Sequence, residues 1–310
     1  MGTPTFAVPI LESLIQSNYE IVLVVTQPDR PKGRKRVLTP SPVKEVAMDH
    51  QIPLFQPEQL KKEYEHLKKY EADLIVTAAY GQLLPSELLD YPTFGSINVH
   101  ASLLPELRGG APIHHAILQG KKETGITIMY MVEKLDAGDI IAQSKIPILH
   151  DDHVGILHDK LAQLGASLLI DTLPSIFNRT NKRIRQDETK ATFASNILRE
   201  DEKIDWNAKH VDVYNHIRGL HPWPGAYANL NNQRFKIWWA ELDDTKYVDQ
   251  TSGNPGEIIE IVNDESIKVI CGNNRAINIT EIQPAGKKRM SVSEFLLGNP
   301  NQLKVGQKLE

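Results

Sequence analysis

An amide, an imidazole and a carboxylate stand where they could act on one substrate. Asn98 and His100 close the apolar run at residues 95–100, and Asp136 follows the apolar run at residues 124–132. Both runs are typical of β-strands. Side chains alternate along a strand, so Asn98 and His100 face the same side. In a parallel sheet successive strands end at one edge, and we expect Asp136 to converge there with the other two.

This set of groups is suited to acyl-type transfer. Asn98 and a protonated His100 could donate hydrogen bonds to a developing oxyanion. Asp136 could stabilise the imidazolium and accept a proton, directly or through water. The sequence has no Gly-x-Ser-x-Gly nucleophile elbow, and its single cysteine, Cys271, stands in no plausible nucleophile motif. We therefore expect a substrate to supply the attacking group, with no covalent enzyme intermediate. Taken singly, His100 could be a satisfied polar side chain, Asn98 a cap for loop backbone and Asp136 a turn former.

The whole-chain totals narrow the class of protein. A chain of 310 residues has room for two domains. Its net charge of −4 means that a polyanion would have to be held by a local basic patch. No apolar run approaches the length of a membrane span, and the chain does not open with a signal sequence. We expect a cytoplasmic monomer that does not contact a membrane.

The sequence supports neither a dinucleotide site nor a metal site. No Gly-x-Gly-x-x-Gly follows a strand, although the fold class alone leaves a dinucleotide-binding oxidoreductase open. His114 and His115 are adjacent, so on a helix they would point about 100° apart and could not chelate one ion from the same face. We expect no metal.

Alternating patterns predict the elements that must position the three polar groups. Short apolar runs alternate with helical stretches through the first two-thirds of the chain, which indicates an α/β domain with a doubly wound, mostly parallel sheet. The expected strands lie at residues 20–26, 72–79, 95–100, 124–132 and 139–148, and the expected helices at residues 6–17, 42–49, 57–70, 111–119 and 153–178. A loop at Gly2 opens the chain where such a domain normally has a strand. We expect that residues upstream of Met1 are missing; the alternative is a sheet that lacks this strand.

A second domain follows a change in composition. Residues 179–205 are polar and charged, and we interpret them as a linker after a catalytic domain at residues 1–178. Residues 206–310 hold a helical stretch near 208–220 and about five short β-rich runs separated in part by polar turns. This pattern predicts a small antiparallel β-barrel of the OB type.

Residues 95–113, taken together with residues 125–139, resemble the 10-formyltetrahydrofolate-dependent formyltransferase family. The resemblance extends over nearly the whole chain. It implies that 10-formyltetrahydrofolate is the formyl donor, and that Asn98, His100 and Asp136 are the catalytic residues. It further implies folate contacts at four consecutive residues, Ser102, Leu103, Leu104 and Pro105.

Further stretches resemble the members of this family that act on initiator methionyl-tRNA. They are the basic loop after residue 29, residues 218–226 and residues 283–290. The resemblance implies that the α-amino group of initiator methionyl-tRNA attacks the formyl carbon through a tetrahedral oxyanion, in support of translation initiation. It also implies that basic side chains hold the tRNA phosphates, which positions a nucleic acid without reading its sequence. The candidates are Arg30, Lys32, Arg34, Lys35, Arg36, Lys287, Lys288 and Arg289, with Arg34 foremost.

Other interpretations remain open. Most basic runs only solvate a surface, and acidic residues slightly outnumber basic ones in residues 201–310, so a tRNA-binding surface there must be one face. A formyltransferase acting on a nucleotide sugar is a second enzymatic interpretation, which the basic loop and the region around Trp223 argue against. An RNA-binding module with a vestigial α/β domain is a non-enzymatic one, which the intact Asn98, His100 and Asp136 argue against.

Overall fold

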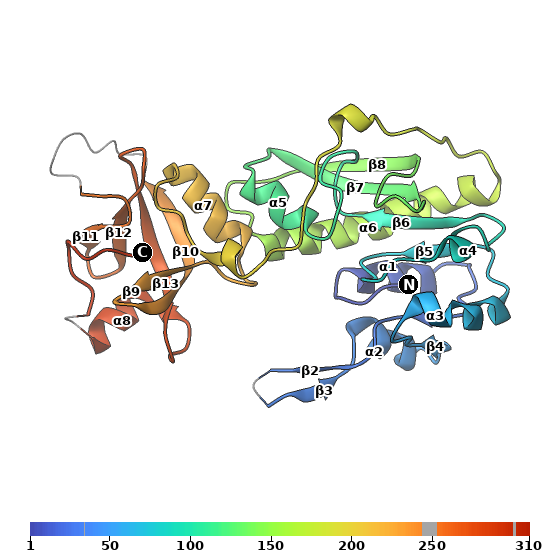
Figure 1. Ribbon diagram of the computed structural model, residues 1–310, viewed down its shortest axis with the longest axis horizontal. Coiled ribbons are helices and arrows are strands. Elements are labelled where there is room, and N and C mark those ends of the chain that lie inside the picture. Colours follow the sequence, from blue (N-terminus) through green and yellow to red (C-terminus); the bar gives the residue numbers. More distant parts are fainter. Residues whose placement is uncertain (34, 244–252, 300–301) are drawn as a thin grey trace. The chain divides into compact units, whose positions relative to one another are not determined.

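The structure is a computed structural model that describes residues 1–33, 35–243, 253–299 and 302–310. Contacts divide the chain into two compact units, each of which is described by itself (Figure 1). The first unit comprises Met1–Pro112, Glu123–Pro147 and His158–Ser195, and the second comprises Ile113–Lys122, Ile148–Leu157 and Asn196–Glu310. No helix in the described ranges is both long and apolar enough to cross a membrane.

Over its described residues, the first unit has the predicted α/β composition, with six strands in two groups besides a hairpin. Four of them form the sheet β5-β6-β7-β8, and the other two form the parallel pair β1-β4. The backbone of Met1 and Gly2 lies between the groups, because the Gly2 N–H donates to the Val25 carbonyl and the Ala78 N–H donates to the Met1 carbonyl. The strands are β1 (Val24–Val25), β4 (Leu54–Phe55), β5 (Ile75–Thr77), β6 (Ser96–His100), β7 (Glu123–Tyr130) and β8 (Ile140–Pro147).

The direction of β7 differs from what we expected. β5 and β6 are parallel, but β7 runs antiparallel to both β6 and β8. Tyr130, at the carboxyl end of β7, pairs with Ile97 near the beginning of β6, whereas His100 pairs with Thr127. The parallel-strand reason for placing Asp136 beside His100 is therefore wrong. The residues after β7 must fold back along β6 to bring the carboxylate there.

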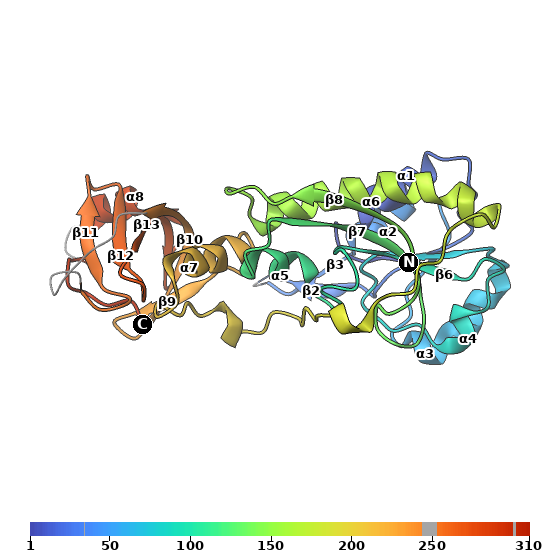
Figure 2. The same ribbon diagram turned by 90° about the horizontal axis from the view of Figure 1, so that it is seen from above.

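Helices cover the sheets of the first unit, and the longest of them packs close against β6. This is α6 (Val154–Phe177), which runs along one face of the four-stranded sheet (Figure 2). A Cβ added at Gly165 would lie 3.0 Å from a Val99 methyl group, so the glycine permits the close approach of α6. The other helices of this unit are α1 (Ala7–Ile15), α2 (Pro42–Asp49), α3 (Leu60–Glu63), the 3₁₀ helix η1 (Tyr64–Tyr70) and α4 (Ser86–Leu89). Two helices cross the boundary: α5 (Pro112–Leu118) belongs to the second unit apart from Pro112, and so do the first four residues of α6.

The local sequence explains where α2 begins. The Ser41 side chain accepts a hydrogen bond from the Lys44 N–H, and Pro42 occupies the first helical turn. A serine cap accepts a hydrogen bond from one free N–H of a helix start, and a proline in the first turn removes another. The predicted helix at 57–70 is instead split into α3 and η1, and it ends at Glu71, which adopts a left-handed conformation.

The basic run is a hairpin rather than an irregular loop. β2 (Arg30–Lys32) and β3 (Val37–Thr39) pair antiparallel, with Arg30 opposite Thr39 and Lys32 opposite Val37. Gly33 and Arg36 have positive φ values of 69° and 49°, as a tight turn requires. The hairpin projects from the rest of the first unit in Figure 1.

The second unit is a small antiparallel β domain, as predicted. Its strand order is β11-β12-β13-β10-β9, and β14 is paired with β13. Asn231 and Asn232 both have positive φ values between β9 and β10, which is the geometry of a two-residue hairpin turn. The strands are β9 (Tyr227–Leu230), β10 (Gln233–Asp243), β11 (Ile258–Val262), β12 (Ser266–Ile270), β13 (Ala276–Pro284) and β14 (Met290–Ser291), and the helices are α7 (His210–Gly219) and α8 (Val292–Gly298).

The predicted linker at residues 179–205 does not coincide with the boundary between the two units in this stretch, which lies between residues 195 and 196. Residues 179–195 belong to the first unit, because part of this segment pairs with the loop after β6. The Arg108 N–H donates to the Thr192 carbonyl at 2.9 Å, and the Ala194 N–H donates to the Arg108 carbonyl at 2.7 Å. We call residues 184–194 the strap. It contains the 3₁₀ turn η2 (Glu188–Lys190), and a second one, η3 (Glu200–Glu202), follows in the other unit.

Candidate active site

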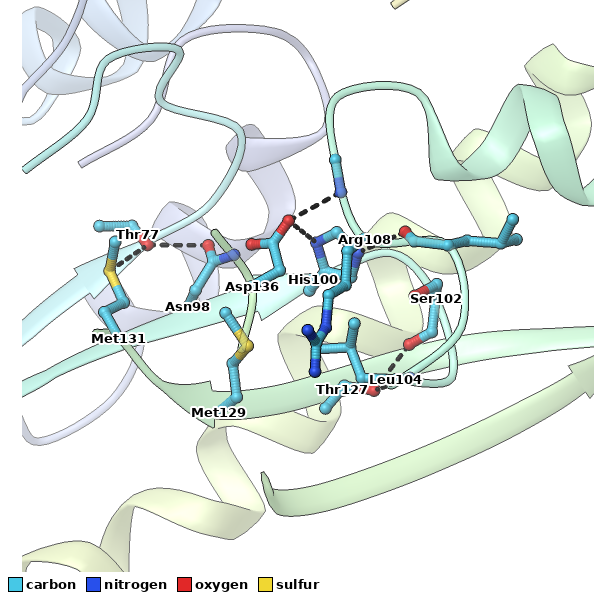
Figure 3. A network of polar contacts seen from close by, with 12 residues as sticks. Thr77, Asn98, His100, Ser102, Leu104, Arg108, Thr127, Met129, Met131 and Asp136 are labelled. Atoms are coloured by element: carbon cyan, nitrogen blue, oxygen red, sulfur yellow. Dashed lines mark hydrogen bonds and ion pairs between the residues drawn. The ribbon is translucent and has the colours of Figure 1, made fainter. Parts of the chain in front are cut away.

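Asn98 lies on β6 with its amide held in one orientation. The Thr77 hydroxyl, on the neighbouring strand β5, donates to Asn98 Oδ1 at 2.8 Å. Because the oxygen is used by Thr77, the Nδ2 donor is turned to the other side, where Figure 3 shows it facing Asp136. Asn98 is half-buried, so this donor works in surroundings partly shielded from water.

His100 ends β6 and is buried, with 5% of its surface exposed. Its Nε2 lies 3.0 Å from the carbonyl oxygen of Leu107. A carbonyl only accepts hydrogen bonds, so Nε2 carries the hydrogen. The other ring nitrogen, Nδ1, lies 3.7 Å from Asp136 Oδ2. This separation is longer than a hydrogen bond, so Nδ1 is the ring atom placed to act on a substrate with the carboxylate beside it.

Asp136 reaches this position through an unusual backbone conformation. Its φ is +48°, a value that non-glycine residues seldom adopt. Its Oδ2 accepts a hydrogen bond from the Gly109 N–H at 2.9 Å. The structure thus brings the three predicted residues Asn98, His100 and Asp136 together, with Asp136 carried there by the loop after β7 (Figure 3).

The arrangement supplies two donors and one negative charge. The amide of Asn98 can donate to an oxygen that gains charge during a reaction, and so can Nδ1 of His100 when the ring is protonated. The carboxylate of Asp136 can hold a positive charge on the ring or accept a proton. Among the described residues, no group of three His, Cys, Asp or Glu side chains is placed to hold a metal ion.

Two of the predicted folate-contacting residues are occupied in shaping their own loop. The Ser102 hydroxyl donates to the Glu106 carbonyl at 2.6 Å, and the Ser102 carbonyl accepts from Thr127 Oγ1 at 2.7 Å. The Leu104 N–H donates to the same Thr127 oxygen at 3.1 Å, and the Leu104 carbonyl accepts from Gln143 Nε2 at 2.9 Å. Both residues are buried, so they hold the loop in place.

The other two predicted folate contacts are more accessible. Leu103 and Pro105 are partly exposed, and they alternate with the buried Ser102 and Leu104. Leu104 packs with Met129 and Ile140 in a small apolar cluster. A ligand lying against this loop would therefore meet Leu103 and Pro105 first.

The site is supported by several residues that no sequence pattern predicted. Thr77 orients Asn98, and Thr127 and Gln143 hold the loop at Leu104. Arg108 is fully buried, which is rare for an arginine and requires paired acceptors. The sequence did hold a signal for this burial, because Arg108 stands between apolar residues and two glycines. An arginine on the surface needs no such neighbours.

The basic residues of the hairpin differ in how they are engaged. Arg30 is paired with Glu58 at 2.8 Å, and both side chains are exposed. Lys35 and Arg36 are exposed at the turn. Arg34, the foremost candidate for a tRNA contact, lies outside the described residues, and Lys32 lies on β2.

The basic residues of the second unit lie at the turn between β13 and β14. Lys287 donates to Asn299 Oδ1 at 3.1 Å, and Arg289 pairs with Glu281. Lys288 is exposed. The charge of Arg289 is therefore partly compensated by its partner, whereas Lys287 and Lys288 keep their positive charge near the surface.

Comparison with known proteins identifies the family. Residues 1–173 match the family model described as formyl transferase, and residues 196–300 match the model of the formyl transferase C-terminal domain. A methionyl-tRNA formyltransferase of Geobacillus sp. (strain WCH70) is 58% identical over 311 residues, which cover 100% of this chain and 96% of that protein. One from Staphylococcus epidermidis (strain ATCC 12228 / FDA PCI 1200) is 58% identical and covers 100% of this chain and 98% of that protein.

Solved structures agree on the fold. An N-formyltransferase from Helicobacter canadensis, in complex with folinic acid and dTDP-3-aminofucose, has a TM-score of 0.68 and 20% sequence identity, covering 91% of this chain and 97% of that one. At this identity the likeness concerns the fold alone. The two family models and the full-length relatives together show that this chain belongs to the formyltransferase family.

Proposed function

We propose that this protein transfers the formyl group of 10-formyltetrahydrofolate to the α-amino group of initiator methionyl-tRNA, for use in translation initiation. The observation that carries the proposal is the convergence of Asn98, His100 and Asp136 in a chain that is 58% identical, over its full length, to methionyl-tRNA formyltransferases. The formyltransferase family uses formyl-tetrahydrofolate as its donor. Attack on the formyl group of this donor creates an oxyanion, which the donor groups of the site can stabilise.

The reaction follows from the groups that the site presents. The amino group attacks the formyl carbon, and the carbonyl oxygen becomes a tetrahedral oxyanion. Asn98 Nδ2 and His100 Nδ1 donate to that oxyanion, since Nε2 of His100 is held by the Leu107 carbonyl. The Asp136 carboxylate can stabilise a positive charge on the ring, and it is placed to accept the proton of the amine, directly or through water. The oxyanion then collapses to the formyl carbonyl and the bond from carbon to N10 breaks. The proton taken from the amine passes to N10, directly from Asp136 or through water, and tetrahydrofolate departs.

The folate is proposed to lie against the loop of residues 102–105. Leu103 and Pro105 would form the apolar wall that it contacts, because they are the partly exposed members. Ser102 and Leu104 would act by holding the loop in shape. A preformed, mostly apolar wall with few polar groups is the usual setting for a ring system of this size.

The tRNA is proposed to contact basic residues in both units. In the first unit these are the hairpin residues Arg30, Lys32, Arg34, Lys35 and Arg36, and in the second unit Lys287, Lys288 and Arg289. Exposed lysine and arginine side chains on a chain with a net charge of −4 give the local positive patches that phosphate binding needs. Because charged initiator tRNA is a substrate of translation, we place the reaction in the cytoplasm. A monomer is the assembly that we propose.

A formylation assay tests the proposal. The purified protein is given 10-formyltetrahydrofolate with initiator methionyl-tRNA, with elongator methionyl-tRNA, or with a nucleotide-linked amino sugar, and the formylated product is quantified. We expect formylation of the initiator tRNA at a kcat/KM above that of the elongator by a factor of about 10 or more, as a discriminating site allows. Faster formylation of the amino sugar than of either tRNA would overturn the proposal in favour of a sugar formyltransferase.

A further inference from the structure

Asp136 lies in the loop between β7 and β8, so contacts outside these two strands must hold its backbone in place. β7 ends beside the beginning of β6, where the Met131 N–H donates to the Ser96 carbonyl at 2.8 Å. The chain must then return to the far end of β6, where His100 stands. It makes this return with Asp136 in a left-handed conformation, at a φ of +48°. Such conformations persist where surrounding contacts hold them.

The strap supplies such a contact through Gln186. This residue is 5% exposed, and its Nε2 donates to the carbonyl of Asp136 at 2.8 Å and to the carbonyl of Gly138 at 2.8 Å. The two bonds clamp the peptide that follows Asp136 and the peptide that follows Gly138. They therefore hold the backbone that aims the Asp136 carboxylate.

The orientation of the Gln186 amide is itself determined by Arg108. Its Oε1 accepts from Arg108 Nε at 3.1 Å and from Nη2 at 2.7 Å. An arginine only donates, so the amide oxygen must face it and the NH₂ group must face the two carbonyls. Both hydrogens and both lone pairs of Gln186 are used, which a carboxylate of the same shape could not reproduce.

An ion pair on the strap keeps Arg108 in place. Glu188 lies 3.0 Å from Arg108 Nη2 and 2.6 Å from Lys134 Nζ. The hydrogen bonds from Arg108 and from Lys134 lower the pKa of the Glu188 carboxyl to about 2, so it stays charged at neutral pH. The backbone of Arg108 pairs with the strap as well, and the next N–H, from Gly109, reaches the Asp136 carboxylate. The strap is thus connected to Asp136 by two routes. One runs through Gln186 to the backbone carbonyl of Asp136, and the other runs through the backbone of Arg108 and Gly109 to the Asp136 carboxylate.

We propose that Gln186 is a positioning residue for catalysis, which acts by holding Asp136 beside His100 and does not touch the substrate. The strap is then part of the catalytic apparatus rather than a passive connection. The inference rests on the proposed function, since it gives Gln186 its role through Asp136.

The test is Gln186→Glu, which keeps the acceptor for Arg108 and the shape of the side chain but removes both donors. The single-turnover rate constant is measured with the full chain, 10-formyltetrahydrofolate and initiator methionyl-tRNA. A displacement of about 1 Å at a reacting group can cost about 100-fold, so we expect the rate constant to fall about 10- to 100-fold. The KM for each substrate should stay within about twofold, because the groups that bind them are unchanged.

A second variant and a control keep the test decisive. Gln186→Met removes the donors without placing a charge near the carbonyls, and it replaces Gln186→Glu if that variant does not fold in a thermal scan. Arg183→Gln serves as the control, because Arg183 binds Asp139 at 3.1 Å, on the same loop, but does not hold the Asp136 peptide. We expect its rate constant to stay within about twofold of the parent.

The outcomes separate this inference from the proposed function. If Asp136→Asn abolishes turnover while folded Gln186→Glu or Gln186→Met turns over at the parent rate, the positioning role is wrong and the proposed function stands. A loss confined to KM would equally overturn it. If Asp136→Asn is fully active, the proposed site itself has failed.

Discussion

At the scale of single residues, His100 owes its orientation to a backbone carbonyl. The Leu107 oxygen holds Nε2 at 3.0 Å and so presents Nδ1 to the site. The sequence indicated that His100 and Asp136 belong together, but it could not show which ring nitrogen acts. That choice depends on a loop whose course is determined by Thr127, Gln143 and the strap, all of them distant in sequence.

The role of Asp136 can be tested by removing its charge alone. Asp136→Asn keeps an oxygen that can accept from Gly109, but it can neither take up a proton nor hold a positive charge on His100. General acid–base groups contribute about 10²- to 10⁴-fold to a rate, and we expect a loss in that range in single-turnover formylation. The thermal midpoint should change little, since one neutral acceptor remains for the Gly109 N–H.

Asp139→Asn is the matched control for that experiment. Asp139 lies on the same loop, and its carboxylate binds Arg183 at 3.1 Å on a partly exposed surface. We expect this variant to keep its rate within about twofold. Equal losses in the two variants would mean that the loop tolerates no change of charge, and that Asp136 has no special part in the chemistry.

At the scale of elements, hydrophobic patterning predicted most of the secondary structure. The expected strands at residues 95–100, 124–132 and 139–148 correspond to β6, β7 and β8, and the expected helix at 42–49 coincides with α2. The five β-rich runs of the second domain are likewise strands. These elements were predictable because each has a strong local period or a capped start.

Strand direction and the path of the strap were not predictable in this way. Both faces of β7 are buried, so its composition resembles that of a parallel strand although its partners are antiparallel. The strap is polar because its side chains bind Arg108 and backbone carbonyls, and a polar composition also describes a linker. Patterns record burial and polarity, whereas partners far apart in sequence decide direction and contact.

At Gly109 the loop after β6 lies directly against the strap. The φ of Gly109 is +119°, and an added Cβ would lie 2.6 Å from the Ala194 carbonyl oxygen. Gly109→Ala should therefore lower the free energy of unfolding by about 1–3 kcal/mol from backbone strain alone. The clash must also displace the N–H that binds Asp136. We therefore expect the single-turnover rate constant to fall further in this variant than a loss of unfolding free energy alone would cause. Calorimetry and the single-turnover assay measure the two effects.

Gly306→Ala separates strain from the clash. Gly306 also has a positive φ, of +87°, but no atom lies within 4 Å of the added Cβ. This variant should lose about 1–2 kcal/mol of unfolding free energy and keep its formylation rate. If Gly109→Ala behaves in the same way, the contact between the two segments does not support the site.

At the scale of the whole molecule, binding of a polyanion depends on where the charge lies rather than on its total. The chain carries 35 Lys and Arg against 39 Asp and Glu, so non-specific attraction is weak and local patches must supply the contacts. Several candidates are already paired, such as Arg30 with Glu58 and Arg289 with Glu281. Among the described residues of the hairpin, we therefore expect the larger contribution to polyanion binding from Lys35 and Arg36, which are exposed at its turn.

The contribution of the hairpin can be measured from the salt dependence of tRNA binding. The logarithm of the binding constant falls as the logarithm of salt concentration rises, and each phosphate contact that releases a counterion makes this fall steeper by about 0.7–0.9. The double variant Lys35→Gln with Arg36→Gln should therefore reduce the magnitude of the slope by about 1–2. The KM for 10-formyltetrahydrofolate should not change. The control is Lys61→Gln with Lys62→Gln, which removes the same charge from exposed positions on α3. A slope that falls equally in both double variants would show that only net charge matters, and an unchanged slope in the hairpin variant would show that the hairpin does not meet the tRNA.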